Sequence, residues 1–309
     1  MATPLLIDAD MGIDDALVLS LALASNAFDI RAVVGVGGSV GIDQVMINIG
    51  RTLKALNPSK RPVVARGLDQ TGPGLVDRRR LFGADGLGEC SLAPDDALRP
   101  VDFRTAYREV IGGAKGQLIV VATGPLSNVA AILTEAPELA RSIKHLYISG
   151  GAAWARGNVN DAAEFNFHRD PQAAAKVLSS GLPITIAPLD ASSLICLDES
   201  HVARLAASGT RAGEILAEIL RYPLDHSEEP APGKTFIHDA VAMGGVLWSS
   251  LFMRTRMRLE VETVGTQAGR CKPSLGGDKS LHVNILTAVN AVDFIENVLE
   301  SLCHDEFVV

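Results

Sequence analysis

Near its start the chain reads Leu5-Leu6-Ile7-Asp8-Ala9-Asp10-Met11-Gly12-Ile13-Asp14-Asp15-Ala16-Leu17. The apolar run at its head is typical of a short buried strand, and the apolar segment Ala16–Ala24 is typical of a helix. The residues between them must form a strand-to-helix turn, and Gly12 permits the sharp bend that such a turn needs. Four carboxylates therefore crowd this one turn, namely Asp8, Asp10, Asp14 and Asp15.

Close negative charges repel unless something neutralises them, and a buried carboxylate left unpaired is costly. The stretch holds no Lys or Arg, since the first Arg of the chain is Arg31. Helix-terminal N–H groups contribute only about 0.3–1 kcal/mol each. A hard divalent cation such as Ca²⁺ or Mg²⁺ takes oxygen ligands, so the stretch favours a metal site. The alternative is helix capping by Asp within a solvated acidic loop.

The composition of the chain is that of an ordinary globular protein. Of its 309 residues 47% are hydrophobic and 21% charged, and neither a linker nor an internal repeat divides them, so we expect a single domain over residues 1–309. A net charge of −8 argues against a nucleic-acid partner. The one compact basic run, Arg78-Arg79-Arg80, is expected to be a solvated loop.

The cysteines Cys90, Cys196, Cys271 and Cys303 are scattered and form no CxxC pair. Their spacing predicts neither a zinc site nor a disulfide framework, and reduced thiols in a cytoplasmic protein are the simplest interpretation. The sequence shows no secretory signal pattern and no apolar run of about 18 residues, so no membrane partner is expected.

Strand-like and helix-like segments alternate along the chain, which predicts an α/β fold with a mostly parallel sheet and helices on both faces. The expected strands are Leu5–Ile7, Ile30–Val36, Pro62–Ala65, Gln117–Ala122, Lys144–Ser149, Leu182–Ala187, Met257–Val264 and Ser280–Leu286. The expected helices are Ala16–Ala24, Asp43–Ala55, one opened by Thr123–Leu126, one beginning at Asp170-Pro171, Thr210–Arg221, one headed by His238-Asp239 and Asn290–Leu302. Ligands of such sheets bind at the carboxyl ends of the strands, where the polar clusters of this chain fall.

The segment Gly67–Pro100 is rich in Gly, Pro and charge, and is expected to be a long loop. It includes Gly72-Pro73-Gly74 and Phe82-Gly83-Ala84-Asp85-Gly86-Leu87-Gly88. Long loops in compact domains are often functional, so the segment is either a mobile flap or a surface excursion.

The acidic stretch resembles the DxDxGxDD signature of the nucleoside hydrolases, the inosine–uridine-preferring family. Four further segments are similar to family segments in the same order. They are Phe82–Gly88 (HGxDGLG flap), Thr123–Asn128 (TGPLTN), Gly157–Pro171 (GN…AEFN…DP) and His238-Asp239 (HD). Together they span roughly residues 5 to 245.

The resemblance implies a Rossmann-like nucleoside hydrolase fold with a mixed, mostly parallel sheet. It implies hydrolysis of the N-glycosidic bond of ribonucleosides to ribose and free base, in nucleoside metabolism such as purine salvage. It also implies one Ca²⁺, with Asp10 as the general base on a Ca²⁺-bound water and His238 near the leaving base. The implied Ca²⁺ ligands are Asp10, Asp15, Asp239 and the backbone carbonyl of Thr123.

The implied substrate contacts are Asp14, Asn158, Glu164 and Asn166 with the ribose, and the positions of Ser39 and Phe82. Asp8 is either a residue that orients the ligands or a simple cap. A homodimer or homotetramer is also expected from the resemblance.

These residue types suit the chemistry. Breaking the bond leaves positive charge on the sugar ring, which nearby carboxylates stabilise more than they stabilise the neutral ground state. Amide side chains both donate and accept, which suits sugar hydroxyls.

Three positions depart from the family pattern. Ser39 replaces a common Asn, Phe82 replaces the common flap His, and Met11 replaces a Pro or Cys in the turn. Ser39 and Phe82 bear on substrate identity rather than on hydrolysis itself. Base specificity is expected to depend on the flap and on residues 221–236, where the candidates are Tyr222, His226 and Phe236.

Three alternatives stay open. One is a glycosidase of the same fold that acts on another ribosyl compound. A second is a non-catalytic protein that binds a nucleoside or a metal. The third is a phosphatase of the haloacid-dehalogenase type, which also opens with DxD after a strand, although here no matching downstream Lys is evident.

Overall fold

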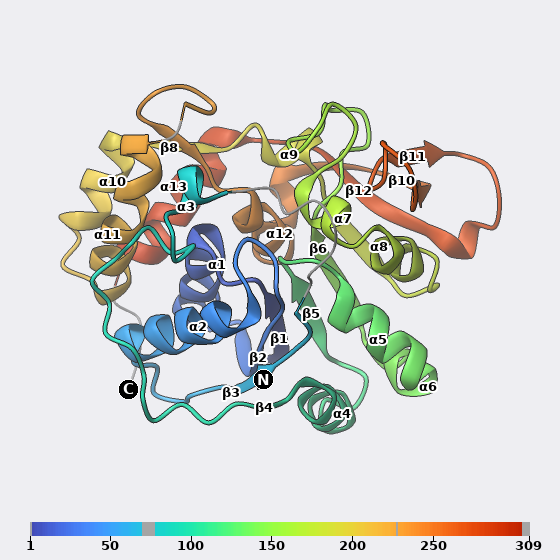
Figure 1. Cartoon of the computed structure of the whole chain (residues 1–309), viewed down its shortest axis with the longest axis horizontal. Coiled ribbons are helices and arrows are strands. Elements are labelled where there is room, and N and C mark those ends of the chain that lie inside the picture. The colour runs from blue at the N-terminus through green and yellow to red at the C-terminus, as the bar shows by residue number, and fades with distance from the viewer. Residues whose placement is uncertain (1, 70–77, 227, 305–309) are drawn as a thin grey trace.

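The computed structural model describes residues 2–69, 78–226 and 228–304. Its centre is a ten-stranded sheet with the order β11-β10-β12-β7-β6-β5-β1-β2-β3-β4 (Figure 1). The strands are β1 Thr3–Ala9, β2 Phe28–Gly35, β3 Val63–Arg66, β4 Val101–Asp102, β5 Ile119–Ala122, β6 His145–Ser149, β7 Ile184–Ala187, β10 Phe252–Val261, β11 Cys271–Ser274 and β12 His282–Val289. Pairing is parallel from β12 to β4, and β10 and β11 extend the sheet as antiparallel strands. The predicted mixed, mostly parallel sheet is therefore confirmed.

A small antiparallel pair, β8 (Cys196–Asp198) with β9 (Lys234–Phe236), lies outside the main sheet. The α-helices are α1 Ile13–Ala24, α2 Ile42–Leu56, α3 Arg79–Phe82, α4 Phe103–Gly113, α5 Ser127–Glu135, α6 Pro137–Ala140, α7 Phe165–Arg169, α8 Pro171–Leu178, α9 Leu189–Ser192, α10 Glu199–Ala206, α11 Arg211–His226, α12 His238–Leu247 and α13 Ala291–Cys303. Short 3₁₀ turns follow at Ser249–Leu251 and Lys279–Leu281. No helix in the described part of the chain is long and apolar enough to cross a membrane.

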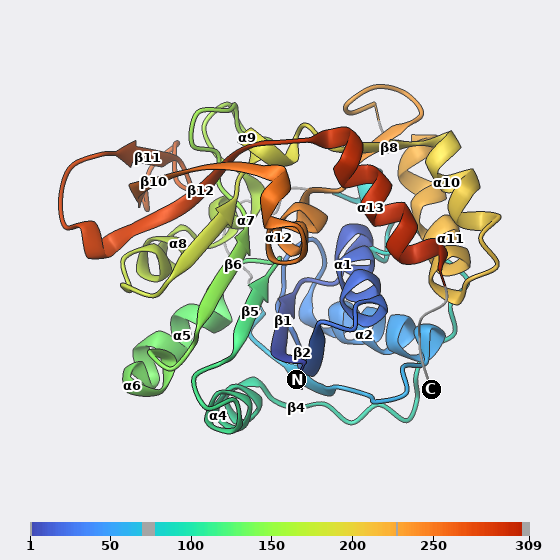
Figure 2. The same cartoon turned by 180° about the vertical axis from the view of Figure 1, so that it is seen from behind.

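Helices cover both faces of the sheet, because strand side chains alternate between two cores. In β1, Leu5 and Ile7 pack with α1, α2, α11 and α12, whereas Leu6 packs in a second core with α4, α5 and α8. Figures 1 and 2 show these two groups of helices on opposite sides of the strands. Burial on both faces explains why the central strands are continuous apolar runs rather than alternating ones.

Several element boundaries differ from the predicted ones. The helix expected to open at Thr123–Leu126 begins at Ser127 instead, so Pro125 lies before it. The helix expected to end at Arg221 continues to His226 with Pro223 inside. Leu216, Ile219, Leu220, Pro223 and Leu224 keep a helical spacing of buried residues, so packing offsets the backbone hydrogen bond that Pro cannot donate.

The predicted strand Met257–Val264 instead begins at Phe252 and ends at Val261. The long segment Gly67–Pro100 carries the short helix α3, which packs on α11, although Gly72-Pro73-Gly74 lies outside the described residues. The carboxyl ends of β1, β2, β5 and β6 all open toward this segment and toward the start of α12 (Figure 1).

Candidate active site

The acidic turn runs from the end of β1 at Ala9 to the start of α1 at Ile13. Met11 adopts a left-handed backbone with φ of 48°, which is unusual for a residue other than glycine. The Gly12 N–H donates to Asp15 Oδ2 at 2.7 Å and so closes the first turn of the helix. The turn thereby directs its carboxylates toward the carboxyl edge of the sheet.

Carboxylate oxygens of Asp14, Asp15 and Asp239 lie within 4.8 Å of one another. Asp239 reaches the group because α12 begins at His238, at the same edge of the sheet as the acidic turn. Burial raises the pKa of all three carboxyls, and the charges of neighbouring carboxylates raise it further. A compact set of hard oxygen donors that repel one another could hold a divalent cation.

Asp10 lies beside this group, and its charge contributes to the raised pKa values of Asp14, Asp15 and Asp239. Its Oδ2 accepts a 2.7 Å hydrogen bond from the backbone N–H of Ser39. A Cβ at Gly38 would lie 2.1 Å from that same oxygen, so glycine is required for this close approach. The three carboxylates that lie within 4.8 Å of one another thus include Asp14 rather than Asp10. The family resemblance instead assigns Asp10 to the metal and Asp14 to the ribose. These role assignments stay predictions.

Thr123, directly after β5, links the acidic turn to the neighbouring loop. Its N–H donates to the Asp8 carbonyl at 2.8 Å, and its hydroxyl donates to Asp15 Oδ1 at 2.5 Å. Its carbonyl accepts a 2.8 Å bond from Asn166 Nδ2, which also donates to the Ser149 carbonyl at 3.1 Å. One amide therefore ties the ends of β5 and β6 together at the floor of the site.

Asp8 lies apart from the cavity, on the opposite core face of β1. It is buried and accepts hydrogen bonds from Tyr107 Oη at 2.8 Å and from Asn128 Nδ2 at 3.1 Å. Burial raises its pKa to about 7, although these two donors lower it. Asp8 lies within strand β1, so the geometry favours the supporting role over the simple cap.

Glu164 is the N-cap of the short helix α7, where its carboxylate accepts from the backbone N–H groups of Gly151, Asn166 and Phe167 at 2.8–3.2 Å. Burial raises the pKa of Glu164, against those donors. Asn158 Oδ1 accepts from the Phe165 N–H at 2.9 Å, so its amide group is oriented by the same helix start. These contacts hold the predicted ribose-binding side chains in place before any ligand arrives.

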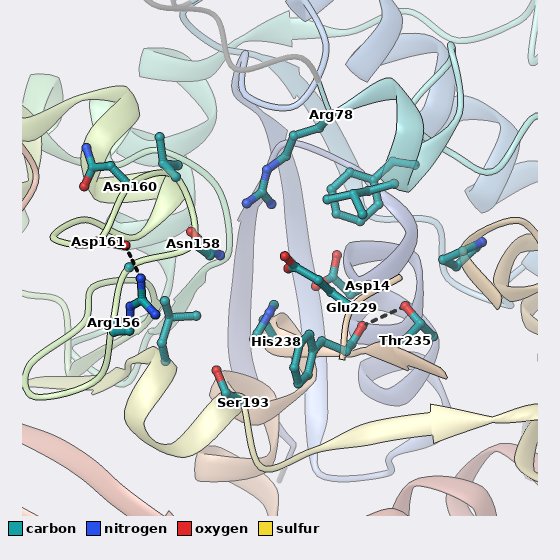
Figure 3. A pocket seen from close by; sticks show the side chains of 17 residues that line it. Asp14, Arg78, Arg156, Asn158, Asn160, Asp161, Ser193, Glu229, Thr235 and His238 are labelled. Atoms are coloured by element: carbon teal, nitrogen blue, oxygen red, sulfur yellow. Dashed lines mark hydrogen bonds and ion pairs between the residues drawn. The ribbon is translucent and has the colours of Figure 1, made fainter. Parts of the chain in front are cut away.

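Two adjoining cavities meet at this edge of the sheet. The inner cavity, of about 40 Å³, is lined by predicted site residues and also by Arg78, Ser149 and Phe165. The predicted residues that line it are Asp10, Asp14, Ser39, Phe82, Thr123, Asn158, Glu164, Asn166, His238 and Asp239. The outer cavity, of about 480 Å³, shares Asp14, Arg78, Phe82, Asn158 and His238 with the inner one (Figure 3). All predicted site residues except Asp8 and Asp15 therefore face one continuous space.

His238 borders both cavities and stacks on Phe236, with 4.8 Å between ring centroids. Its Nδ1 is 2.9 Å from Ser192 Oγ. Burial, and then the charge of Arg78, lower the pKa of His238 to about 3, so the imidazole is neutral at neutral pH. Of the three base-contact candidates, Phe236 lines the outer cavity, whereas Tyr222 and His226 stack on each other outside it.

The expectation of a solvated basic run is wrong for Arg78. Arg79 and Arg80 are exposed, but the Arg78 guanidinium lies over the Phe165 ring, 4.2 Å from its centroid, and points into the cavity (Figure 3). Its position four residues before Phe82, in the flap segment, was the one feature of the sequence that could have indicated this. Asn48, Tyr107 and Asn128 were also missed, because their contacts join segments far apart in the chain.

A mostly parallel sheet with an acidic, amide-lined cavity at its carboxyl edge defines an α/β enzyme. Comparison with known proteins narrows the class: the model of the "Inosine-uridine preferring nucleoside hydrolase" family matches residues 5–296. The chain belongs to this family, and it is a hydrolase that acts on N-glycosyl compounds. The family resemblance of the sequence motifs is thereby confirmed.

Among its relatives, the chain is 33% identical over 272 residues to the pyrimidine-specific ribonucleoside hydrolase RihA of Citrobacter koseri, with 86% of each chain covered. The RihA of Salmonella arizonae is equally similar. Two solved structures share the fold. A plant nucleoside hydrolase has a TM-score of 0.91 at 23% identity, covering 98% of this chain and 99% of that one. The purine-preferring ribonucleoside hydrolase of Gardnerella vaginalis has a TM-score of 0.89 at 24% identity, covering 97% and 98%.

Proposed function

We propose that this chain hydrolyses ribonucleosides to ribose and free base with Asp10 as the general base. The observation that carries the proposal is the meeting of Asp10, Asp14, Asn166 and Asp239 in one small cavity with His238 at its mouth. As the bond between the sugar carbon and the base nitrogen breaks, a water next to Asp10 would add to that carbon and lose its proton to the carboxylate. The base would leave with the electron pair of the broken bond and take up a proton.

The side chains of the cavity are suited to the charge that develops. Positive charge builds on the sugar ring as the base departs, and the carboxylates favour this state over the neutral substrate. Because the carboxylates are fixed by bonds such as Ser39 N–H to Asp10, little reorganisation is needed during the reaction. Asn158 and Asn166 would form hydrogen bonds with the ribose hydroxyls, and the Asp14 carboxylate would accept hydrogen bonds from those hydroxyls.

We further propose Ca²⁺ as the cofactor, held by Asp10, Asp15, Asp239 and the Thr123 carbonyl. The close approach of Asp15 and Asp239, whose pKa values are raised by burial and by neighbouring carboxylates, supports a hard divalent ion among these oxygen donors. When bound, such an ion orients the attacking water and makes it easier to deprotonate.

The leaving base would lie in the outer cavity, between Phe82 of the flap and the Phe236–His238 stack. The names of the curated relatives support a pyrimidine base, so uridine and cytidine come first among substrates to test. A second candidate, an N-glycosidase of the same fold acting on another ribosyl compound, is supported by Ser39 and Phe82, which depart from the family pattern.

We also propose that residues 1–309 act as one domain of a cytoplasmic homodimer or homotetramer, as the family resemblance suggests. Size-exclusion chromatography with light scattering tests the assembly.

The decisive experiment measures ribose release from uridine, cytidine, inosine, adenosine, guanosine, xanthosine and nicotinamide riboside, with and without a Ca²⁺ chelator. Asp10→Ala is the test variant, and Asp43→Ala, at an exposed carboxylate that pairs with Arg66, is the matched control. We expect release that depends on metal, is lost in Asp10→Ala and survives in Asp43→Ala. No release from any compound by folded, metal-loaded enzyme would rule the proposal out and favour a binding role.

A further inference from the structure

Arg78 is a cation that lies among the carboxylates and aromatic rings of the cavity, whereas Arg156, which also lines the outer part, pairs with Asp161. The Arg78 guanidinium lies 4.2 Å from the centroid of the Phe165 ring and 5.6 Å from that of Phe82. It lines the inner and the outer cavity alike, and Figure 3 shows it reaching in from the flap side toward Asn158 and Asp14. A side chain in this position would touch any ligand that fills the cavity.

Among the described residues, no hydrogen bond or ion pair engages this guanidinium. Two aromatic rings lie against it, and they offset only part of the cost of removing a guanidinium from water. Burial lowers the pKa of Arg78, while the charges of Glu164, Asp14, Asp10 and Asp239 raise it. Arginine nevertheless stays protonated in proteins, so a full positive charge with several N–H donors faces the cavity.

The acidic residues alone are a poor permanent partner for this charge. Under the proposed function a divalent cation shares the same carboxylates, and the reaction builds positive charge on the sugar. Both changes place further positive charge near Arg78 and raise the cost of holding it there. An anionic group on the substrate would offset the electrostatic repulsion between Arg78 and these positive charges while the substrate is bound.

Asn158 supplies a second donor on the same side of the cavity. Its Oδ1 is occupied by the Phe165 N–H at 2.9 Å, which leaves the Nδ2 hydrogens to face the ligand. Figure 3 shows Asn158 and Arg78 approaching the same part of the cavity from different sides. Glu164 is close by, but three backbone N–H groups bind its carboxylate and weaken its repulsion of an incoming anion.

We propose that Arg78 and the Asn158 amide bind an anionic group of the substrate, so that the cavity takes ribosyl compounds bearing a phosphate at the 5′ position. The inference rests on the proposed function for the placement of the sugar, because the family resemblance implies that Asn158, Glu164 and Asn166 hold its 5′ and 3′ hydroxyls. The contact of Arg78 with Phe165, the neighbour of Glu164, places the cation on that side. A carboxylate on the base would be the other source of the same anion.

The test compares anionic and neutral members of matched pairs. The kcat/KM of the Ca²⁺-loaded enzyme is measured for uridine, uridine 5′-monophosphate and orotidine, in wild type, Arg78→Gln and Arg78→Lys. Arg80→Gln is the matched control, because Arg80 is an exposed arginine two residues away that pairs with Glu228. Calorimetric binding of ribose 5-phosphate against ribose gives a readout that needs no turnover.

We expect Arg78→Gln to lower the ratio of kcat/KM for the monophosphate to that for uridine by about tenfold or more, with Arg78→Lys intermediate and Arg80→Gln unchanged. Ribose 5-phosphate should lose its binding advantage over ribose in Arg78→Gln. A fall confined to orotidine would assign the anion to the base. Unchanged ratios for both anionic substrates, with uridine still hydrolysed, would overturn the inference and leave the proposed function standing. If no ribosyl compound is hydrolysed, the proposed function fails, and the ribose 5-phosphate binding comparison decides the inference alone.

Discussion

The side-chain amide of Asn48 donates a 3.2 Å hydrogen bond to the carbonyl oxygen of Met11, in the middle of the acidic turn. The same Nδ2 donates to the carbonyl of Asp85 at 2.8 Å. Asp85 belongs to the glycine-rich flap, and its carboxylate pairs with Arg51 of α2 at 2.9 Å. One fully buried amide on α2 therefore joins the turn that carries the carboxylates to the base of the flap.

We predict that Asn48→Ala lowers kcat/KM about tenfold while the protein still folds. The substitution leaves two buried carbonyls without their donor, at about 1–3 kcal/mol, and frees the left-handed Met11 to shift the carboxylates beside it. Kinetics and thermal unfolding are measured together. Gln44→Ala is the control, because Gln44 Nε2 donates to Asn48 Oδ1 and its removal leaves both hydrogen bonds of Asn48 Nδ2 in place. Full activity in a destabilised Asn48→Ala protein would show that the bond serves stability alone.

A second prediction concerns Asp15, whose pKa is held well above its usual range by burial and by the charges of Asp10 and Asp14. In metal-free protein Asp15 must either stay charged among like charges or take up a proton, and both oppose folding, so Asp15→Asn should raise the unfolding temperature. Ca²⁺ at 100 times its Kd should stabilise wild type by about 2.7 kcal/mol and the variant far less, so the order of stabilities reverses. Scanning calorimetry with chelator and with Ca²⁺ tests this, with Asp43→Asn as control. Equal Ca²⁺ shifts in both proteins would remove Asp15 from the metal site.

A third prediction concerns Phe82, the aromatic residue in place of the common flap His. If its ring stacks on the leaving base, Phe82→Leu loses about 0.5–1.5 kcal/mol of binding and raises KM roughly 2–10-fold with little change in kcat. Steady-state kinetics on the best nucleoside gives both constants. Leu81→Ala, at a neighbouring position lining the outer cavity, separates stacking from loss of apolar surface. A fall in kcat at constant KM would instead place Phe82 in the chemical step.

The sheet, and the edge of the sheet at which the polar side chains gather, could be predicted because both depend on local patterns. Apolar runs ending in Asp8–Asp15, Thr123 or Gly150 mark strands whose carboxyl ends share one edge of the sheet. A helix was predicted to begin at Asp170-Pro171, and Asp170 is indeed the N-cap of α8, where its side chain accepts from the Ala173 N–H at 2.9 Å. Strand ends and N-caps such as these depend on residues that are close together in the chain, so they can be predicted from the sequence.

Contacts between distant segments could not be obtained in this way. Asn48 lies 37 residues from both of its acceptors, and Tyr107 lies 99 residues from Asp8. Nothing in the local pattern of α2 or α4 distinguishes these polar side chains from other helix residues. The path of Arg78 into the cavity likewise depends on the packing of α3 against α11 and on the Phe165 ring, neither of which composition reveals.

The last prediction concerns acid stability and His145 on β6. Burial, and then the charge of Arg254 on strand β10 of the same sheet, lower the pKa of His145 to about 4, from 6.5. The ring contacts Thr185 Oγ1 at 2.9 Å and lies 4.5 Å from the Tyr147 ring, centroid to centroid. Well above pH 6.5 the residue is neutral in the folded and the unfolded state and contributes no pH dependence to stability.

As the pH falls from about 6.5 to about 4, the unfolded chain takes up a proton at His145 that the folded protein refuses, so stability must decline. The unfolding free energies of wild type and His145→Gln are measured with urea across this range. The free energy of wild type relative to the variant should decrease as the pH falls, with a slope of at most that expected for the uptake of about one proton, and should level off below pH 4. Arg254→Gln removes the second cause of the lowered pKa of His145. The pKa of His145 in the folded protein should therefore rise in this variant, and the pH range over which stability declines should end at a higher pH. A difference between wild type and His145→Gln that stays constant from pH 7 to pH 4 would mean that the folded protein protonates His145 as readily as the unfolded chain does.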